Sequence, residues 1–517
     1  MENHPSDKLA LKWLSEQGEY EEITYGSLLA KANQLAGGLR QLGLTKGDRV
    51  LVMVPRQIIA YVIYMACLKL GLVIIPSSEM LRAKDLSYRF QHSQARAVIA
   101  WSTLTGEVDR AYDEGHPNLE FRIAVADEAS ASTAAGMSPG WHSLAHLMED
   151  QPEVFETVPT HRDDTAILAY TSGTTGNPKG VIHSHGWAYA HLRIASTLWL
   201  DIKPGDIVWA TAAPGWQKWI WSPFLSVLGR GATGFVYHGS FHPGHYLRLI
   251  QEYGIEVLCC TPTEFRIMAK LEHLRDYNLS SLRSVVSAGE PLNQEVIEVF
   301  RRVHNLTIRD GYGQTESTLL IGNLMDSPVR LGSMGKAISP GLIEIVDDEG
   351  KVVPPGVVGD IAVHVDMPAL FKGYYNDPER KKNNQRGDYF ITGDRARADE
   401  DGYFWYEGRG DDIIISSGYT IGPFEVEEAL MKHPAVKECA AVASPDEIRG
   451  AVVKAFIVLM EGTEGTPGLI KELQSHVKAL TAPYKYPRKI EFIASLPKTN
   501  SGKIRRVELR AQEYAGK

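Results

Sequence analysis

At 517 residues the chain is too long for a single hydrophobic core, because domains typically hold roughly 100–200 residues. Its hydrophobic fraction of 44% and charged fraction of 23% are ordinary for a globular protein. The net charge of −9 argues against a nucleic-acid partner, since surfaces that bind nucleic acid are usually basic.

The cysteines and the apolar segments indicate in which cellular compartment the protein is expected. The cysteines show no metal-ligand spacing, so we expect reduced, mostly buried thiols in a cytoplasmic protein: Cys67, Cys259, Cys260 and Cys439. The first seven residues lack the basic and apolar regions of a signal peptide. The apolar run 58–75 is about as long as a membrane span, but Lys69 and Gly71 interrupt it. We interpret it as a buried helix followed by a strand, and we expect no integral membrane contact.

Helices alternate with short apolar strands through most of the chain. An apolar helical face predicts a helix over residues 28–42, which ends at Gly43. The next predicted elements are a strand at 50–54, a helix at 59–70, a strand at 72–75, a helix near 85–92 and a strand at 97–100. Residues 125–160 are expected to form surface connections, and the alternation resumes from Thr165 to about Arg309. This pattern predicts a layered α/β domain.

The pattern changes near Leu331, where turn residues separate short strand-like runs at 341–346, 359–365 and 403–406. Helix and strand return later as a helix at 425–433, strands at 440–443 and 452–459, and a helix at 469–480. We therefore expect an N-terminal domain over residues 1–410, with layered α/β subdomains and a small β-rich subdomain. A small mobile α+β domain is expected over residues 411–517.

The segment 171–180 follows an apolar strand and is rich in Gly, Ser and Thr, with one lysine, Lys179. Glycines let successive backbone N–H groups point into one concavity, and hydroxyls and an ammonium add donors. The segment therefore predicts a cradle for a polyphosphate. It is not a Walker A loop, because Pro178 replaces the second glycine and Gly180 follows the lysine. A flexible surface loop is the alternative for such a segment in isolation.

This segment resembles the phosphate loop of the adenylate-forming superfamily, which includes acyl-CoA synthetases, luciferases and peptide-synthetase adenylation domains. Four further segments match family motifs in the family's order: SAGEP at 287–291, DGYGQTE at 310–316, TGD at 392–394 and PKTNSGK at 497–503. The resemblance runs from about Ile23 to Arg510 and is nearest to medium-chain acyl-CoA synthetases. It implies ATP, Mg²⁺ and CoA as reactants and cofactors.

The resemblance also implies roles for individual residues. Tyr312 would stack on adenine, Thr315 would bond the α-phosphate and Glu316 would ligate Mg²⁺, while Lys503 would offset charge on the transferring α-phosphate. Asp394, assisted by Arg409, would accept hydrogen bonds from the ribose hydroxyls. The expected catalytic residues are Lys503, Thr315 and Glu316. The expected ATP-binding residues are Thr171, Ser172, Gly173, Thr174, Thr175, Gly176, Lys179, Gly289, Glu290, Pro291, Asp310, Gly311, Tyr312, Gly313, Gln314, Thr315, Asp394, Arg409 and Lys503.

The acyl pocket and the CoA site follow from the same resemblance. Trp216 would be a wall of the acyl pocket, and Gly313 would deepen it, since acetate-using relatives have tryptophan there. Asp411 would be the hinge between the domains. Thr420 stands where the family usually has arginine, which removes a cation near the nucleotide or CoA. The expected CoA contacts are Ser417, Gly418, Tyr419, Arg449, Lys478, Tyr486 and Arg488.

These inferences predict an AMP-forming acyl-CoA synthetase that acts on a medium-length or branched carboxylic acid. An enzyme that loads a carrier protein is the main alternative, although the basic Tyr486–Pro–Arg488 segment favours CoA. An aryl-acid CoA ligase is less favoured, and the joint motifs disfavour a non-catalytic nucleotide-binding protein. Homodimerisation is left open. His183 and His185 are expected to be structural, because no acidic or cysteine ligands accompany them.

Overall fold

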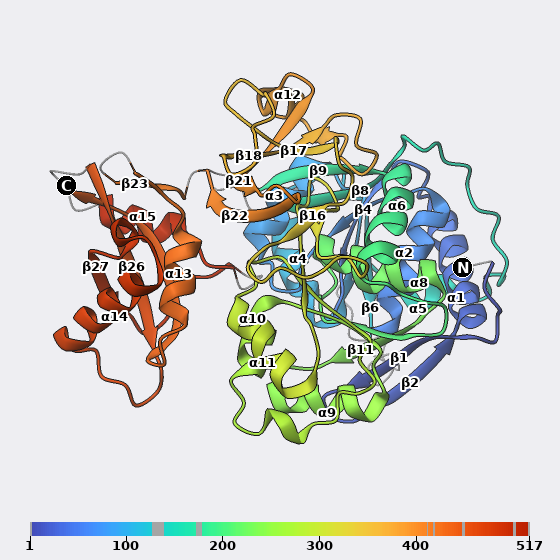
Figure 1. Ribbon diagram of the computed structural model, residues 1–517. Coiled ribbons are helices and arrows are strands. Elements are labelled where there is room, and N and C mark those ends of the chain that lie inside the picture. The colour runs from blue at the N-terminus through green and yellow to red at the C-terminus, as the bar shows by residue number, and fades with distance from the viewer. Residues whose placement is uncertain are drawn as a thin grey trace.

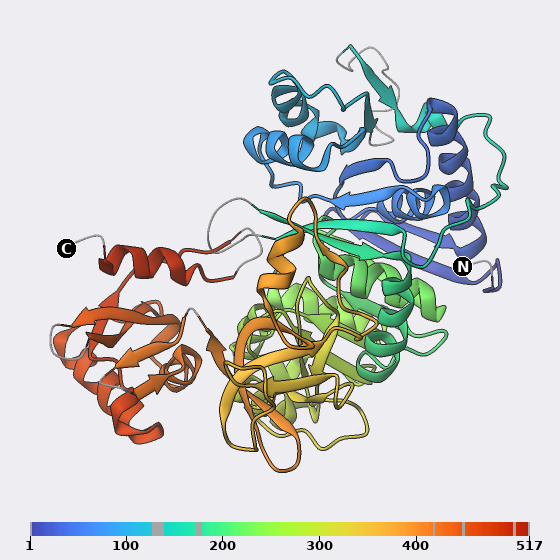
Figure 2. The same cartoon turned by 90° about the horizontal axis from the view of Figure 1, so that it is seen from above.

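The computed structural model describes residues 3–126, 139–171, 178–410, 412–416, 419–446, 450–499 and 503–514. It has a large N-terminal part built on two sheets and a smaller C-terminal part, which stands to one side in Figures 1 and 2. The expected fold class, a large α/β domain followed by a small α+β domain, is confirmed.

The first sheet has eight strands in the order β19-β9-β8-β4-β3-β5-β6-β7. Its central strands pair in parallel and are buried along almost their whole length, as sheets covered on both faces require. Strands β8 and β9 form an antiparallel hairpin, whose connection is the predicted phosphate loop. The bounds are β3 Arg49–Met53, β4 Val73–Pro76, β5 Ala97–Trp101, β6 Phe121–Val125, β7 Trp141–Ser143, β8 Thr165–Thr171, β9 Lys179–Ser184 and β19 Gly373–Tyr374.

The helices around this sheet are α1 Tyr25–Leu42, α2 Ile58–Leu70, α3 Ala83–Ser93, α4 Thr105–Tyr112 and α5 Leu144–Met148. The apolar run 58–75 is indeed a buried helix followed by strand β4. Among the described residues, no helix has both the length and the apolar character that a membrane crossing needs. The expectation of surface connections over 125–160 is partly wrong, since β7 pairs with β6 and α5 follows it directly.

The second sheet has fourteen strands in the order β17-β18-β21-β22-β16-β15-β14-β13-β12-β10-β11-β1-β2, with β20 paired to β21. Its parallel half joins its antiparallel half where β14 pairs with β15. The expected β-rich subdomain is therefore the antiparallel end of this sheet. The bounds are β1 Leu9–Ser15, β2 Tyr20–Thr24, β10 Ile207–Ala210, β11 Thr233–His238, β12 Val257–Cys260, β13 Ser284–Ala288, β14 Arg309–Gly313, β15 Leu319–Gly322, β16 Gly335–Ala337, β17 Ile343–Val346, β18 Val358–His364, β20 Gln385–Arg386, β21 Tyr389–Ala398 and β22 Tyr403–Arg409.

Two helices of this half continue into π-helical segments, which are rare and often mark functional sites. Helix α6 runs into the π-helix Leu192–Trp199, and α7 runs through the π-helix Ile220–Ser226 into α8. The bounds of the helices are α6 His185–His191, α7 Gln217–Trp219, α8 Val227–Arg230, α9 Pro243–Tyr253, α10 Pro262–Ala269, α11 Gln294–His304 and α12 Pro378–Asn383.

The C-terminal part has its own apolar core, formed between helices and a three-stranded sheet in the order β25-β26-β27. The four cysteines of the chain are buried and free, as the sequence predicted. The bounds of the elements are β23 Ile414–Ser416, β24 Tyr419–Ile421, α13 Pro423–Met431, β25 Val436–Asp446, β26 Gly450–Leu459, α14 Pro467–Leu480, β27 Lys489–Phe492 and α15 Arg506–Tyr514.

Candidate active site

Lys179 and Glu316, predicted from separate motifs, lie beside the same tyrosine. The Tyr374 hydroxyl donates to Oε1 of Glu316 at 2.9 Å, and Nζ of Lys179 lies 5.7 Å from the centre of the Tyr374 ring. Burial lowers the pKa of Lys179, the cation Arg380 lowers it further, and Glu316 opposes both effects. The hairpin β8–β9 and the β14–β15 connection therefore meet at one place.

Asp394 is buried, with an exposed fraction of 6%, and accepts hydrogen bonds at both carboxylate oxygens. Its Oδ2 accepts from the Tyr312 hydroxyl at 2.7 Å and from Nε2 of Gln314 at 2.5 Å. Its Oδ1 accepts from the Tyr406 hydroxyl at 3.1 Å. A carboxylate has about four acceptor positions, and the described residues fill three of them, which leaves one on Oδ1 for a ligand hydroxyl.

The backbone around Asp394 is that of a paired strand. Asp394 lies within strand β21 and pairs in register with Arg409 of β22. A ladder position fixes the backbone on both sides, which holds a carboxylate more firmly than a turn does. The pairing also brings the predicted ribose carboxylate and its predicted helper onto neighbouring strands.

Asp310 is the most strongly perturbed acid in the predicted nucleotide site. Burial raises its pKa to about 7, and the N–H groups of Gly311 and Leu292 and the cation of Lys218 only partly offset that effect. Its side chain accepts from the Gly311 N–H at 2.9 Å, and its carbonyl accepts from Nε1 of Trp199 at 3.3 Å. Such shifts gather at functional sites.

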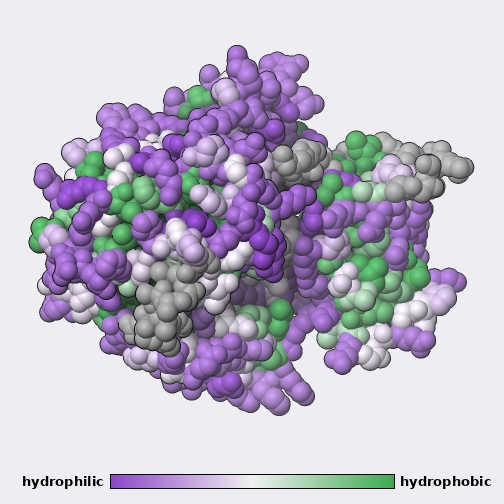
Figure 3. Space-filling model, turned by 180° about the vertical axis from the view of Figure 1, so that it is seen from behind, coloured by the Kyte–Doolittle hydropathy of each residue, from purple (hydrophilic) through white to green (hydrophobic). Residues whose placement is uncertain are grey.

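Lys503 lies where the C-terminal part faces this group of residues. Its side chain is exposed, yet surrounding protein desolvates it and lowers its pKa. Glu290 and Asp394 oppose this shift, whereas Lys218 and Arg409 add to it. All four of these neighbours belong to the N-terminal part, so the lysine faces the groove between the two parts that Figure 3 shows.

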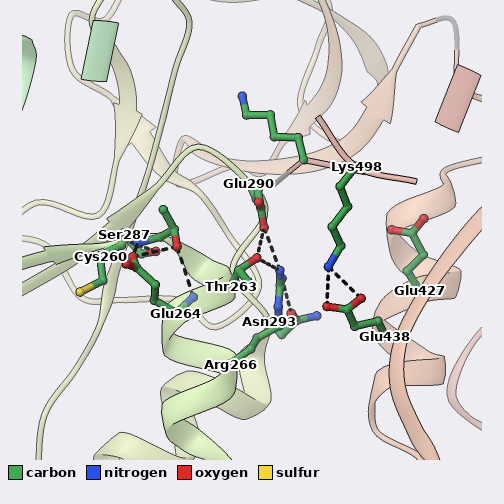
Figure 4. A network of polar contacts seen from close by, with 12 residues as sticks. Cys260, Thr263, Glu264, Arg266, Ser287, Glu290, Asn293, Glu427, Glu438 and Lys498 are labelled. Carbon is green, nitrogen blue, oxygen red and sulfur yellow. Dashed lines mark hydrogen bonds and ion pairs between the residues drawn. The ribbon is translucent and has the colours of Figure 1, made fainter. Parts of the chain in front are cut away.

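Glu290, from the SAGEP segment, belongs to a polar network on the N-terminal side of the groove (Figure 4). Its Oε2 accepts from Oγ1 of Thr263 at 2.9 Å and from Nη2 of Arg266 at 2.8 Å. On the facing side, Lys498 forms an ion pair with Glu438 at 2.7 Å. The network holds Glu290 in place, and the facing ion pair keeps Lys498 within the C-terminal part.

The predicted acyl wall lies against the end of strand β4. Trp216 is half-buried and immediately precedes α7, and the residue before it, Gly215, has φ +93°. A Cβ at Gly215 would lie 2.5 Å from the backbone of Ser77 and Ser78, so only glycine allows this approach. Trp209 and Trp219, in contrast, are buried in the core. Trp216 is therefore the tryptophan of these three that is available to a ligand.

Two further polar side chains of this segment escaped the sequence analysis. Nζ of Lys218 donates to the carbonyl of Ala288, within the SAGEP segment, at 2.5 Å. Gln217 has an exposed fraction of 8%, and within the described part of the chain neither of its amide atoms has a partner. The sequence did offer one signal, a polar residue at the start of the aromatic run. The sequence could not show that the side chain of this residue is buried.

Three of the predicted CoA contacts form one cluster in the C-terminal part. Nζ of Lys478 lies 3.9 Å from the centre of the Tyr486 ring, and Nη1 of Arg488 donates to the Tyr486 hydroxyl at 2.8 Å. Lys478 and Arg488 are exposed, so two cations flank one half-buried ring. Tyr419 begins β24, far along the chain from this cluster.

Several predicted residues lie outside the described residues: Ser172, Gly173, Thr174, Thr175, Gly176, Asp411, Ser417, Gly418 and Arg449. The predicted phosphate loop is thus described only at its flanks. Thr171 ends β8 and Pro178 precedes β9, and the Pro178 carbonyl accepts from the Tyr88 hydroxyl at 2.9 Å.

The fold and this group of residues define an AMP-binding enzyme. The family model for the AMP-binding enzyme matches residues 1–375, and the model for the AMP-binding enzyme C-terminal domain matches residues 425–503. The chain belongs to the AMP-binding enzyme family.

Two relatives match almost the whole length of this chain and indicate which members of the family it resembles. The chain is 57% identical to the uncharacterized acyl-CoA ligase YtcI of Bacillus subtilis (strain 168), covering 98% of this chain and 93% of the relative. It is 40% identical to the mitochondrial acyl-coenzyme A synthetase ACSM3 of Homo sapiens, covering 98% and 86%. The second match agrees with the resemblance to medium-chain acyl-CoA synthetases.

Solved structures of related enzymes have the same fold as this chain. The anthranilate CoA ligase AuaEII in complex with anthranoyl-AMP superimposes with a TM-score of 0.90 at 28% identity, covering 99% of this chain and 95% of that one. ATP-bound MatB from Rhodopseudomonas palustris superimposes with a TM-score of 0.86 at 25% identity, covering 99% and 96%.

Proposed function

We propose that the protein is an AMP-forming acyl-CoA synthetase that acts on a medium-length or branched aliphatic carboxylic acid. The observation that carries this proposal is that residues of four distant motifs are neighbours: Lys179 and Glu316 lie beside Tyr374, and Lys503 lies close enough to Asp394 for the two charges to interact. The named activities of the relatives, acyl-CoA ligase and acyl-coenzyme A synthetase, support it.

In the proposed first step, a carboxylate oxygen of the acid attacks the α-phosphorus of ATP, and the bond to pyrophosphate breaks. The product is an acyl-adenylate. Lys179 would neutralise the polyphosphate, while Lys503 would stabilise the charge that develops on the α-phosphate. Because both ammonium groups have lowered pKa values, each is partly desolvated, and its interaction with phosphate oxygens is stronger than in water.

The nucleoside would be held by the second sheet. Tyr312 is fixed by its hydrogen bond to Asp394, so its ring can present one face to adenine without further ordering. The remaining acceptor position of Asp394 would receive a ribose hydroxyl. Pre-ordered groups of this kind lower the entropy cost of binding.

Glu316 fits the chemistry of Mg²⁺ in donor type, since this hard cation prefers oxygen ligands and usually takes only one or two protein carboxylates. The Tyr374 hydroxyl orients one oxygen of Glu316 and leaves the rest of the carboxylate for a cation. Bound there, Mg²⁺ would neutralise charge on the phosphates. Thr315, the preceding residue, would donate its hydroxyl to the α-phosphate.

In the proposed second step, the CoA thiol attacks the acyl carbonyl carbon and AMP leaves with the bonding electrons. The C-terminal part would rotate about Asp411, removing Lys503 and admitting the thiol. The cations Lys478 and Arg488 beside Tyr486 suit the phosphates and the adenine of CoA. Thr420 supplies no cation, so this cluster would carry more of the CoA binding.

A panel of carboxylic acids, assayed for AMP release with CoA, tests the proposal. We expect acid-dependent ATP–pyrophosphate exchange and acyl-CoA formation from medium-length or branched acids. Exchange without transfer to CoA, but with transfer to a carrier protein, would instead identify a carrier-loading enzyme. Activity confined to aryl acids would favour the aryl-acid alternative, which the likeness to an anthranilate CoA ligase supports.

We further infer a cytoplasmic location, because four buried free thiols suit a reducing compartment. Homodimerisation remains a prediction, and light scattering of the purified protein would check it.

A further inference from the structure

Three buried aromatic side chains at four-residue spacing lie beneath the connection between β14 and β15. They are His183, Trp187 and His191, with exposed fractions of 0%, 2% and 0%. The His183 and Trp187 rings are 4.4 Å apart between centroids, and Trp187 stacks on His191 at 5.2 Å with an interplanar angle of 12°. We name these three residues the aromatic ladder.

The aromatic ladder hydrogen-bonds to three residues of segment 315–318, which contains the residues proposed to bind Mg²⁺ and the α-phosphate. The Thr315 carbonyl accepts from Nε2 of His183 at 2.6 Å, and the Ser317 carbonyl accepts from Nε1 of Trp187 at 3.0 Å. Nδ1 of His191 lies 2.5 Å from Oγ1 of Thr318. The segment 315–318 is therefore held on its inner side by one rigid stack.

His191 also reaches the segment that follows the proposed acyl wall. Its Nε2 lies 2.9 Å from the carbonyl of Trp221, in the π-helix that continues α7. Because a carbonyl only accepts, Nε2 carries the proton, and Nδ1 accepts from the Thr318 hydroxyl. One ring thus links the two segments, with a different nitrogen for each.

The charge state agrees with this arrangement. Burial lowers the pKa of His183 to about 3 and that of His191 to about 4, so both rings are neutral at physiological pH. A neutral imidazole has one donor and one acceptor nitrogen, which is the pair that His191 uses.

We propose that His191 is a positioning residue that ties the nucleotide-binding segment 315–318 to the acyl-wall segment 216–226, with His183 and Trp187 fixing the rest of the nucleotide segment. This inference rests on the proposed function. It gives the structural role expected for His183 a specific object, the Thr315 carbonyl. Occupancy of the acyl pocket would act on Trp221, and through His191 it would act on Thr318, so that acid and ATP bind with coupled affinities.

Two substitutions separate the two bonds of His191. Asparagine carries its polar atoms at the δ position, so His191→Asn keeps a partner for Thr318 and loses the bond to Trp221. Glutamine carries them at the ε position, so His191→Gln keeps the bond to Trp221 and loses Thr318. His191→Gln leaves the buried Thr318 hydroxyl without its ring partner, an effect on the order of tenfold in affinity. His191→Asn removes one of two bonds to the Trp221 carbonyl, which still accepts from the Ser226 hydroxyl at 2.6 Å, so its effect is the smaller one of a single hydrogen bond.

We expect His191→Gln to raise the dissociation constant of Mg-ATP about tenfold, measured calorimetrically without acid, while His191→Asn leaves it within about twofold. His191→Asn should instead raise KM for the acid about fivefold, the size of one hydrogen bond, with little change in His191→Gln. Thr318→Val, which removes the hydroxyl from the other side, should reproduce the ATP effect of His191→Gln. Together, Thr318→Val and His191→Gln should cost no more than either alone.

The matched controls are His146→Asn and His146→Gln, since the His146 side chain is 80% exposed on α5. If both His191 variants lost ATP affinity and acid affinity equally, and these losses followed the drop in unfolding temperature of each variant, the proposal would be overturned. If the His191 variants do not fold, unchanged ATP affinity in Thr318→Val would overturn it. Wild-type protein that binds ATP but shows no acid-dependent exchange would refute the proposed function alone, because the ATP measurements need no adenylate.

Discussion

The hydroxyl of Tyr312 donates to Oδ2 of Asp394 at 2.7 Å, which joins the proposed adenine platform to the proposed ribose carboxylate. Gln314 occupies the other acceptor position of the same oxygen. Adenine and ribose would therefore be recognised by one hydrogen-bonded unit that spans β14 and β21.

Tyr312→Phe keeps the ring and removes the hydroxyl from this unit. We expect KM for ATP to rise about fivefold, the usual effect of one hydrogen bond, with kcat little changed. Tyr403→Phe is the matched control, because the buried Tyr403 hydroxyl donates to the Pro328 carbonyl at 2.6 Å, outside the proposed site. Steady-state kinetics with ATP as the varied substrate check the prediction, and equal effects of the two changes would contradict it.

Lys503→Ala removes the one proposed catalytic group that the C-terminal part supplies. Adenylation should slow by roughly 10²–10³, the size seen when one charge-stabilising donor is removed. Transfer of a preformed acyl-adenylate to CoA should stay nearly intact. Single-turnover measurements of the two half-reactions check this.

Lys498→Ala is the control, because Lys498 lies in the same motif but pairs with Glu438 at 2.7 Å within the C-terminal part. Its adenylation rate should stay near that of the unmodified protein. Equal loss of both half-reactions in Lys503→Ala would refute the two-state assignment of the C-terminal part.

The lowered pKa of Lys503 predicts the alkaline side of the pH profile. Desolvation moves this pKa below that of an ordinary lysine, so the ammonium loses its proton at a lower pH. The adenylation rate should therefore fall earlier on the alkaline side than an ordinary lysine would allow. Lys503→Arg keeps its charge throughout, so its alkaline limb should move to higher pH. Coincident limbs in the two proteins would show that another group titrates.

The sequence was sufficient to predict the elements that have strong periodicity or dense motifs. The apolar run 58–75 resolved into α2 and β4, and Lys179 and Glu316, taken from separate motifs, lie beside the same tyrosine. These features were predictable because each is determined by the residue types of one short stretch of sequence.

Long-range pairing was not predictable from the same patterns. Strand β1 pairs with β11, more than two hundred residues away, and nothing near residue 9 indicates that partner. Tyr374 and Tyr406 lie outside the recognised motifs, although they hydrogen-bond Glu316 and Asp394. Such residues gain their roles only when the fold brings distant strands together.

The structure changes what a substitution at Gly313 can test. A Cβ at this position would lie 2.1 Å from the Thr318 carbonyl oxygen and 3.3 Å from Cα of Leu319. Any side chain therefore displaces the backbone of β15 as well as occupying the pocket. Gly313→Ala measures the backbone effect alone, and Gly313→Trp adds the ring.

Both Gly313 variants should lose stability and activity. Beyond that shared loss, Gly313→Trp should shift the preference towards acetate or propionate, measured as relative kcat/KM over acids from acetate to octanoate. A profile that is identical in Gly313→Ala and Gly313→Trp would count against the assignment of Gly313 to the acyl pocket.

The amide of Gln217, which has no hydrogen-bond partner among the described residues, predicts a conflict between stability and ligand binding. Burying an amide without a partner costs about 1–3 kcal/mol, so Gln217→Met should raise the unfolding temperature of the ligand-free protein. If the amide serves the acyl-adenylate, the variant should gain less stability than wild type from a non-hydrolysable acyl-adenylate analogue. Gln34→Met is the control, because Nε2 of Gln34 donates to the Gln151 carbonyl at 3.3 Å and its removal should not stabilise. A lower unfolding temperature for Gln217→Met would show that the amide is paired in solution.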